Sequence, residues 1–443
     1  ALASSSRRSG STLSRWLELE DQPDGRHLVL GLRRRMIGTV AATVNGTLMH
    51  AEDWDDSPHT SYYFPALLAA AERNHSSGRD LIVAWVAAYE VWGSVLPALV
   101  PDRQLNPTSV IAPIAAAVGA GLLYRLSGLE LRYAIGIAAA ASSGIRANFG
   151  TDTKGLDAGR SAAAGLLAVQ LASAGWDADE SALEGFKGFF DCFGGPGADP
   201  ARGADGLGTQ YRSAVVPADP AAGGYLDPAT WPPAYSPKLA RRPRPAPAMV
   251  PARTGGRGSP TVKAWPCCLG ANAALTLLFS LVRQHGIRPG DITEIEVTVP
   301  RELRNTAMFR DPPRTGLEAK FSLPYVIASA WADGDVTLDS FQSAAFQLTM
   351  AAGRMEAVRI VTDPEMAGRG ESGRVEVRTR DGLSQSLTGT GLGLHLLPPA
   401  ITQKFTASAL ESMSAADAAA VARAVWAMED LGSLDEITGP LGP

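Results

Sequence analysis

The densest group of proton-handling side chains lies at residues 50–59, HAEDWDDSPH, which hold two histidines and four carboxylates. If a helix continues through this segment, His50 and Asp53 lie three residues apart and share one face. The residues fit a metal site, a helix end with a solvated acidic turn, or a proton-transfer site where a carboxylate and an imidazole meet one substrate. Common helical metal motifs place ligands four residues apart or repeat a Glu-x-x-His unit. Because neither spacing occurs here, we expect no metal.

A second candidate is NFGTDTKGLDAGRSAAAG, residues 148–165, where a glycine-rich loop leads into a helix. Asp157 is a natural N-cap, Lys154 stands just before the helix, and Arg160 lies in its first turn. The helix N-terminus and these two cations could hold a carboxylate or a phosphate. The alternative is a capped helix with an ordinary surface lysine. The order of residues is not that of a P-loop.

Two later segments carry reactive side chains, VKAWPCCLGANAA at 262–274 and EAKFSLPYVIAS at 318–329. Cys267 and Cys268 lack a second cysteine pair for zinc, so we interpret them as buried and unreactive thiols at a strand-to-helix junction. Tyr325 lies in an apolar helical run and either belongs to the core or presents its phenol as a hydrogen-bond donor. With only one further cysteine, the chain cannot build a disulfide framework, which predicts a reducing, cytoplasmic setting.

Length and charge limit the class of protein. A chain of 443 residues is too long for one ordinary core, which predicts two domains. The net charge of −5 provides no basic surface for a nucleic acid. The longest apolar run, residues 81–100, contains Glu90, so we expect a buried helix and no contact with a membrane. The first ten residues lack the apolar core of a secretory signal, so we expect none.

The pattern along the chain predicts the elements that must position these side chains. Alanine- and glycine-rich helices are expected at 107–128, 129–145 and 157–176, and again at 415–432. Residues 217–260 hold 11 of the 31 prolines and predict a long exposed insert or loop. Between them and the last helix, strands are expected at 292–300 and in a hairpin at 373–389, with helices at 271–286 and 317–334. The expected fold is therefore of the α plus α/β type with two domains: a large all-α helical-bundle domain, 1–216 and 400–443, and an inserted smaller α+β domain, 261–399.

Four ordered motifs carry a family resemblance: NGTLMHAEDWDD, FGTDTKGLDAGRSAAAGLLA, VKAWPCCLGANAA and EAKFSLPYVIASA, followed by QKF at 403–405. The chain resembles the MmgE/PrpD superfamily of 2-methylcitrate dehydratases, cis-aconitate decarboxylases and iminodisuccinate epimerases. The resemblance implies a discontinuous helical domain, an α+β lid, a cleft between them, no metal, no organic cofactor and a homodimer. It also implies that the chain begins inside the first helical segment of the family.

The resemblance assigns functional positions one at a time. The family's aspartate matches Asp53, its threonine four residues on matches Ser57, and its catalytic histidine matches His59 at a shorter spacing. The family's lysine matches Lys154, and its tyrosine matches Tyr325. We therefore expect Asp53, His59, Lys154 and Tyr325 to be catalytic and Ser57 to bind substrate.

Three positions depart from the family, which usually has histidine where this chain has Asn106, Asp157 and Asn272. Asparagine cannot carry a proton near neutral pH as histidine does. An acidic Asp157 beside the expected lysine also reduces the attraction for anions, so the departures favour an acid with less charge than a tricarboxylate. We expect these three residues, together with Arg160 and Cys268, to contact the substrate.

The leading hypothesis is a cofactor-independent lyase of the dehydratase type acting on a small hydroxy or unsaturated carboxylic acid. Lys154 would bind the carboxylate and stabilise enolate-like charge, Asp53 with His59 would move the proton on carbon, and Tyr325 would donate to the leaving group. Decarboxylation and epimerisation use the same kind of intermediate and stay open. So do a non-catalytic family member that serves as a binding or oligomerisation module and a metal-dependent enzyme using residues 50–59.

Overall fold

The structure of the protein is a computed structural model that describes most of the chain. The described residues are 1–21, 24–57, 59–99, 105–195, 197–204, 225–226, 261–301, 303, 311–366, 372–389, 395–396 and 398–442. The predicted proline-rich insert at 217–260 lies outside them, apart from the short strand β4 (Tyr225–Leu226), which pairs with β10 (His395–Leu396). Among the described residues, no helix combines the length and apolar character needed to cross a membrane.

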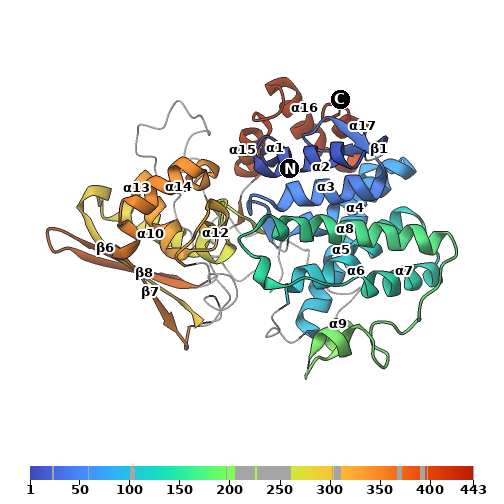
Figure 1. Cartoon of the computed structure of the whole chain (residues 1–443), viewed down its shortest axis with the longest axis horizontal. Helices are drawn as coiled ribbons and strands as arrows, with labels where there is room; N and C mark the ends of the chain where they lie inside the picture. The colour runs from blue at the N-terminus through green and yellow to red at the C-terminus, as the bar shows by residue number, and fades with distance from the viewer. Residues whose placement is uncertain are drawn as a thin grey trace.

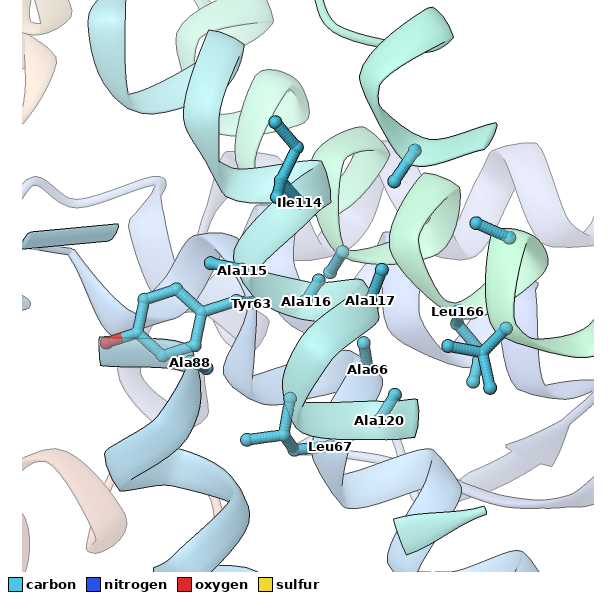
Figure 2. Close-up of a cluster of buried hydrophobic side chains, with 14 of the residues drawn as sticks. Tyr63, Ala66, Leu67, Ala88, Ile114, Ala115, Ala116, Ala117, Ala120 and Leu166 are labelled. Atoms are coloured by element: carbon cyan, nitrogen blue, oxygen red, sulfur yellow. The ribbon is translucent and has the colours of Figure 1, made fainter. Parts of the chain in front are cut away.

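The helical part packs around one central helix, as the right side of Figure 1 shows. This helix is α6 (Pro107–Leu123), and nearly all of its side chains are buried. Its neighbours are α4 (Phe64–Asn74), α5 (Gly78–Ala98), α7 (Gly128–Ala140) and α8 (Asp152–Ser173). Figure 2 shows buried side chains from four of these helices in this core, among them Leu67, Ala88, Ala120 and Leu166. Alanines fill most of this core, so the helices approach closely without large side chains between them.

Two glycines bring α3 (Gly38–His50) against α8. A Cβ atom on Gly159 would lie 1.9 Å from the carbonyl oxygen of Thr43, and one on Gly46 would lie 2.6 Å from the Cα of Gly159. Only glycine fits at this crossing. The contact matters for function because α3 ends one turn later at His50, beside the first turn of α8.

The α+β part, on the left of Figure 1, is built on a four-stranded mixed sheet with the order β7-β6-β8-β9. Strand β6 (Ile292–Pro300) runs parallel to β7 (Val358–Asp363) and antiparallel to β8 (Gly373–Thr379), which pairs with β9 (Ser384–Gly389). The predicted strand at 292–300 and the hairpin at 373–389 are confirmed. Helices α10 (Leu269–Gln284) and α13 (Leu323–Asp333) share one hydrophobic core with the sheet.

The C-terminal helices return to the N-terminal ones. Helices α15 (Pro398–Ala409), α16 (Ala415–Trp426) and α17 (Asp435–Thr438) lie beside α1 (Leu2–Ser5) and α2 (Arg8–Leu19) in Figure 1. The amide of Gly78 also donates to the carbonyl of Leu431 at 2.9 Å. The mostly helical fold with a small mixed sheet is thus as predicted, whereas the exact domain boundaries and the movement of a lid stay predictions.

Two predicted helices differ from those observed. The helix predicted to begin at 157 begins at Asp152 after the N-cap residue Thr151, so the prediction that Asp157 is the N-cap was wrong. The segment predicted as one helix at 317–334 is two, α12 (Gly316–Ala319) and α13. The break follows from Ser322, which caps α13 by accepting from the amide of Tyr325.

Candidate active site

A cavity of about 190 Å³ lies between the helical and α+β parts, and its walls come from both. From the helical part it is lined by the end of α3, the loop that follows, the start of α6 and the first turn of α8. From the α+β part it is lined by the segment that leads into α10. Its charged and titratable lining residues are His50, Asp53, His59, Tyr62, Arg146, Lys154, Lys263 and Cys268.

A short loop after α3 carries most of these groups. Asp53 adopts a left-handed backbone conformation with φ of +51°, which is uncommon for a residue other than glycine. Residues 56–57 then form strand β3, which pairs with β5 at 261–262, and Ser57 contributes its backbone to this pairing. The pairing sets Lys263 directly beside the loop.

Asp53 joins the two lysines of the cavity. Its Oδ1 lies 2.8 Å from Nζ of Lys154 and 3.1 Å from Nζ of Lys263. Burial alone would raise the pKa of Asp53, but the two ammonium charges outweigh burial and hold the pKa well below its usual range. Asp53 is therefore a stable carboxylate that organises two cations, and its low pKa makes it a weak base.

His50 is the second partner of Lys154, since its Nε2 lies 2.5 Å from the ammonium nitrogen. An ammonium group can only donate, so Nε2 accepts and the ring proton sits on Nδ1. Nδ1 then donates to Oδ2 of Asp55 at 2.6 Å. Burial, and next the charge of Lys154, lower the pKa of His50 to about 4, so the ring is neutral at neutral pH.

Asp55 holds both histidines of the loop. Its Oδ2 accepts from Nδ1 of His59 at 3.1 Å, as well as from His50 and from the hydroxyl of Ser61 at 2.8 Å. Its Oδ1 pairs with Lys263 at 3.1 Å. Because Nδ1 of His59 is committed to Asp55, Nε2 is the nitrogen of His59 that can exchange a proton with a ligand in the cavity.

The same loop also contains a cluster that could hold a metal ion. One ligand atom each from His50, Asp55 and His59 lies within 4.8 Å of the others. A divalent cation there would sit next to the ammonium groups of Lys154 and Lys263, which Coulomb repulsion opposes. The hydrogen bonds of the cluster also already satisfy the three ligand atoms. The arrangement fits a proton-handling network better than a metal centre.

Two of the residues that were predicted to contact the substrate, Asn106 and Cys268, line the cavity. Asn106 is buried and donates to the hydroxyls of Ser109, at 2.6 Å, and Tyr62, at 3.3 Å. Cys268 lies on the opposite wall, and burial raises the pKa of its thiol to about 11, so it stays neutral. Both offer neutral hydrogen-bonding groups to a ligand.

Asp157 and Arg160 form a neighbouring pair in α8 rather than part of the lining. Their side chains lie 3.5 Å apart, and the guanidinium also donates to the side chain and the carbonyl of Ser143. Burial raises the pKa of Asp157. The predicted direct contact of either residue with substrate has no geometric support and stays a prediction.

Two further predicted site residues lie within the core of the α+β part. Asn272 closes the turn before α10, accepting from the amide of Trp265 at 3.2 Å and donating to the carbonyl of Cys268 at 3.2 Å. The hydroxyl of Tyr325 donates to the carbonyl of Ser340 at 2.6 Å, and its ring is fully buried. The structure does not bring either side chain to the cavity with Asp53, Lys154 and His59.

Lys263 is the functional candidate that the sequence analysis missed, and the family resemblance gave no role to His50. The amino-acid composition could have pointed to Lys263. Only six of the 40 basic residues are lysine, so this chain builds its ordinary charged surface from arginine. Lys154 and Lys263 are both buried at the cavity. Because lysine is rare in this chain, each lysine is a candidate for a specific role in the site.

Two family models match the chain. A model of the MmgE/PrpD N-terminal domain matches residues 1–200, and a model of the MmgE/PrpD C-terminal domain matches residues 265–430. The chain is similar to cis-aconitate decarboxylase from Homo sapiens, with 28% identity over 326 residues, 69% of this chain and 58% of that protein.

The chain is also similar to two further cis-aconitate decarboxylases. The protein from Mus musculus is 31% identical over 168 residues, 35% of this chain and 34% of that protein. The protein from Aspergillus terreus is 29% identical over 197 residues, 40% of either chain. This chain therefore spans less than two thirds of the length of each of these relatives.

Proposed function

The chain belongs to the MmgE/PrpD family, and we propose that it is a lyase that acts on a small carboxylic acid through a carbanion or enolate-like intermediate, without an organic cofactor. One observation carries the proposal: Lys154, held by a permanent carboxylate and a neutral imidazole, shares a cavity with a second histidine that an aspartate orients. Such a constellation can bind an acid, stabilise negative charge on its carbon skeleton and move one proton.

Lys154 is the lysine that contacts the substrate. Its ammonium has three N–H groups, and among the described residues it has two acceptors, Asp53 and His50. Lys263 instead faces three acceptors at 3.1 Å, the carbonyl and carboxylate of Asp53 and the carboxylate of Asp55. Lys154 thus retains one N–H for a ligand carboxylate, while Lys263 acts through its charge.

Charge balance at the cavity favours a substrate with one or two carboxylates. Lys154 and Lys263 face the ionised Asp53 and Asp55, so these four groups together carry no net charge. A tricarboxylate would carry more negative charge than this site neutralises. The neutral Asn106 and Cys268 on the walls add no charge.

We place decarboxylation ahead of dehydration, the first expectation from the sequence, because the relatives described above are cis-aconitate decarboxylases. The bond between the substrate carbon and a carboxylate carbon breaks, carbon dioxide leaves, and the electron pair delocalises onto the adjoining unsaturated acid. Lys154 stabilises this charge, and a proton from Nε2 of His59 forms the new C–H bond. Solvent then returns the proton to His59.

A substrate panel tests the proposal. Wild-type protein is incubated with cis-aconitate, citrate, 2-methylcitrate, iminodisuccinate and unsaturated dicarboxylic acids, and released carbon dioxide and products are measured. We expect decarboxylation of an unsaturated acid, with bound metal well below one ion per chain. Water loss or epimerisation would replace the reaction assigned here, and a full complement of metal would favour the metal-dependent alternative. Homodimerisation and cytoplasmic location stay predictions.

A further inference from the structure

The loop that carries Asp53 is held in an unusual way. Its backbone turns through a left-handed residue, so it is not part of a helix or a strand at the point where the carboxylate must be placed. The carboxylate of Asp53 lies 2.8 Å from the ammonium of Lys154. A small rotation of the backbone at Asp53 would break this contact. The precision of the site therefore depends on what restrains residues 51–55.

The carbonyl oxygens of residues 52, 53 and 54 each accept a hydrogen bond from a different lysine. The three pairs are Lys320 Nζ with Glu52 O at 2.8 Å, Lys263 Nζ with Asp53 O at 3.1 Å, and Lys404 Nζ with Trp54 O at 2.5 Å. The next carbonyl, of Asp55, accepts from the backbone amide of Lys263 at 3.1 Å. Four consecutive carbonyls are thus held by residues from outside the loop.

Lys320 and Lys404 each hold a second carbonyl, on the segment that enters α10. Lys320 donates to Pro266 at 3.1 Å, and Lys404 donates to Lys263 at 2.9 Å. Each ammonium group therefore joins the loop to the segment that carries the second cation of the cavity. Lys320 comes from the α12–α13 junction and Lys404 from α15, so three separate parts of the chain meet at this loop.

Aromatic rings and acidic groups complete the surroundings of these two lysines. The ammonium of Lys320 lies 4.4 Å from the ring centre of Phe341 and pairs with Glu52 at 3.2 Å. The ammonium of Lys404 lies 4.8 Å from the ring centre of Trp54. Neither lysine is among the residues that line the cavity as described, so neither can touch a substrate there.

Burial makes both groups costly to keep charged. It lowers the pKa of Lys320, and it lowers the pKa of Lys404 to about 7. This chain places four of its six lysines at Asp53 and its loop, while arginine supplies nearly all other basic residues. Lysine suits this task because its compact ammonium donates in several directions, whereas the guanidinium of arginine is a flat fork.

We propose that Lys320 and Lys404 are positioning residues of the active site, which fix the backbone of residues 52–54 so that the Asp53 carboxylate stays between Lys154 and Lys263. The proposal rests on the proposed function only where turnover is measured. Its structural consequence, a rigid loop, is independent of the substrate.

The test compares Lys320→Met and Lys404→Met with wild type, since methionine has an unbranched apolar side chain about as long as the stem of lysine and removes its donors. Lys187→Met, at an exposed lysine, is the control for losing a cation, and Ile295→Val, in the core of the sheet, is the control for general loss of stability. The readouts are hydrogen exchange of the Asp53 and Lys263 amides, which bond to the carbonyls of His50 and Asp55, and the separate values of kcat and KM.

Each Met variant is expected to exchange these two amides at least about ten-fold faster, with kcat about 10- to 100-fold lower and KM within about three-fold. Ile295→Val is expected to lower the Tm with kcat unchanged. Met variants that lose stability but keep wild-type kcat and loop exchange would overturn the proposal, because the lysines would then be structural only.

Two further measurements keep the proposal falsifiable if the Met variants do not fold. Lys320→Gln and Lys404→Gln keep two of the three N–H donors on a shorter side chain and should show the same effects at smaller size. Unchanged kcat and exchange in folded Gln variants would contradict the proposal. In the wild type, the Asp53 and Lys263 amides should exchange as slowly as those of α3, and exchange at the rate of exposed loops would overturn it. If wild type turns over no substrate, the proposed function fails, while the exchange data still decide the role of the lysines.

Discussion

The Lys154 ammonium lies 2.5 Å from Nε2 of His50, although the two residues are 104 positions apart. The contact fixes the imidazole as an acceptor at this nitrogen and uses one of the three N–H groups of the lysine. The ion pair to Asp53 uses a second N–H, which leaves one N–H of this cavity-lining lysine for a ligand.

Replacing Lys154 should abolish most turnover without unfolding the chain. In Lys154→Met the substrate loses its charged donor, whereas Asp53 keeps its ion pair with Lys263. We expect kcat/KM to fall by about 10²- to 10³-fold, the usual effect of removing one stabilising donor. Steady-state kinetics measure this, with Lys187→Met as the control. Wild-type kinetics in Lys154→Met would remove the lysine from the mechanism.

Replacing Lys263 should chiefly cost stability. Lys263→Met leaves the buried carboxylate of Asp55 without its cation and Asp53 with only one. Breaking a buried ion pair in this way typically costs about 3–5 kcal/mol. Urea unfolding measures the free energy, and Arg132→Met, which breaks the half-exposed pair with Glu180, should cost less than about 1 kcal/mol. Equal losses in the two variants would contradict the buried network.

Stability should depend on the protonation of His50. Its pKa of about 4 in the folded chain lies below the ordinary value of 6.5, so between these pH values the unfolded chain binds a proton that the folded chain does not. The contribution of His50 is therefore complete above pH 6.5 and is lost as the pH falls toward 4, by roughly 2 kcal/mol between pH 7 and 5.

Urea unfolding at several pH values tests this sign. His50→Gln should flatten the pH dependence between 6.5 and 4, whereas His285→Gln, at an exposed position, should keep the wild-type slope. The interpretation of a neutral, buried His50 fails if both variants retain the same slope as wild type.

Removing the hydroxyl of Tyr325 should leave turnover intact. The hydroxyl donates to the carbonyl of Ser340 within the core of the α+β part, so Tyr325→Phe should cost about 1–2 kcal/mol through the unpaired carbonyl. We expect kcat to stay within about two-fold of wild type. A hundred-fold lower kcat at near wild-type stability would instead restore the catalytic role that the family resemblance predicts.

Local patterns in the sequence were sufficient for three of the four strands in the sheet of the α+β part. The alternation at 292–300 and the Asp381–Gly382 turn predicted β6 and the hairpin because one face of the sheet is buried and Gly382 adopts a positive φ of +85°. The start of α8 was wrong because Gly155 was interpreted as a loop residue. It lies in the helix, where a side chain would meet Ala51 at 3.4 Å.

The site itself depends on contacts that spacing does not encode. His50 and Lys154 meet because Gly46 and Gly159 let α3 and α8 cross closely, and nothing in either segment alone predicts that crossing. Lys263 enters through the pairing of two short strands that are more than 200 residues apart. The family resemblance supplied Asp53, Lys154 and His59, and the structure adds their partners.

The most direct test of the central claim, that this cavity transfers a proton to substrate carbon through His59, is proton NMR in deuterium oxide. Wild-type protein should convert an unsaturated carboxylic acid with release of carbon dioxide and incorporate one deuteron at a carbon over which the electron pair was delocalised. His59→Gln should slow this by about 10²- to 10⁴-fold, the usual range for a lost general acid. No turnover and no C–H exchange on any acid of the panel would contradict the lyase and favour a family member that serves as a binding module.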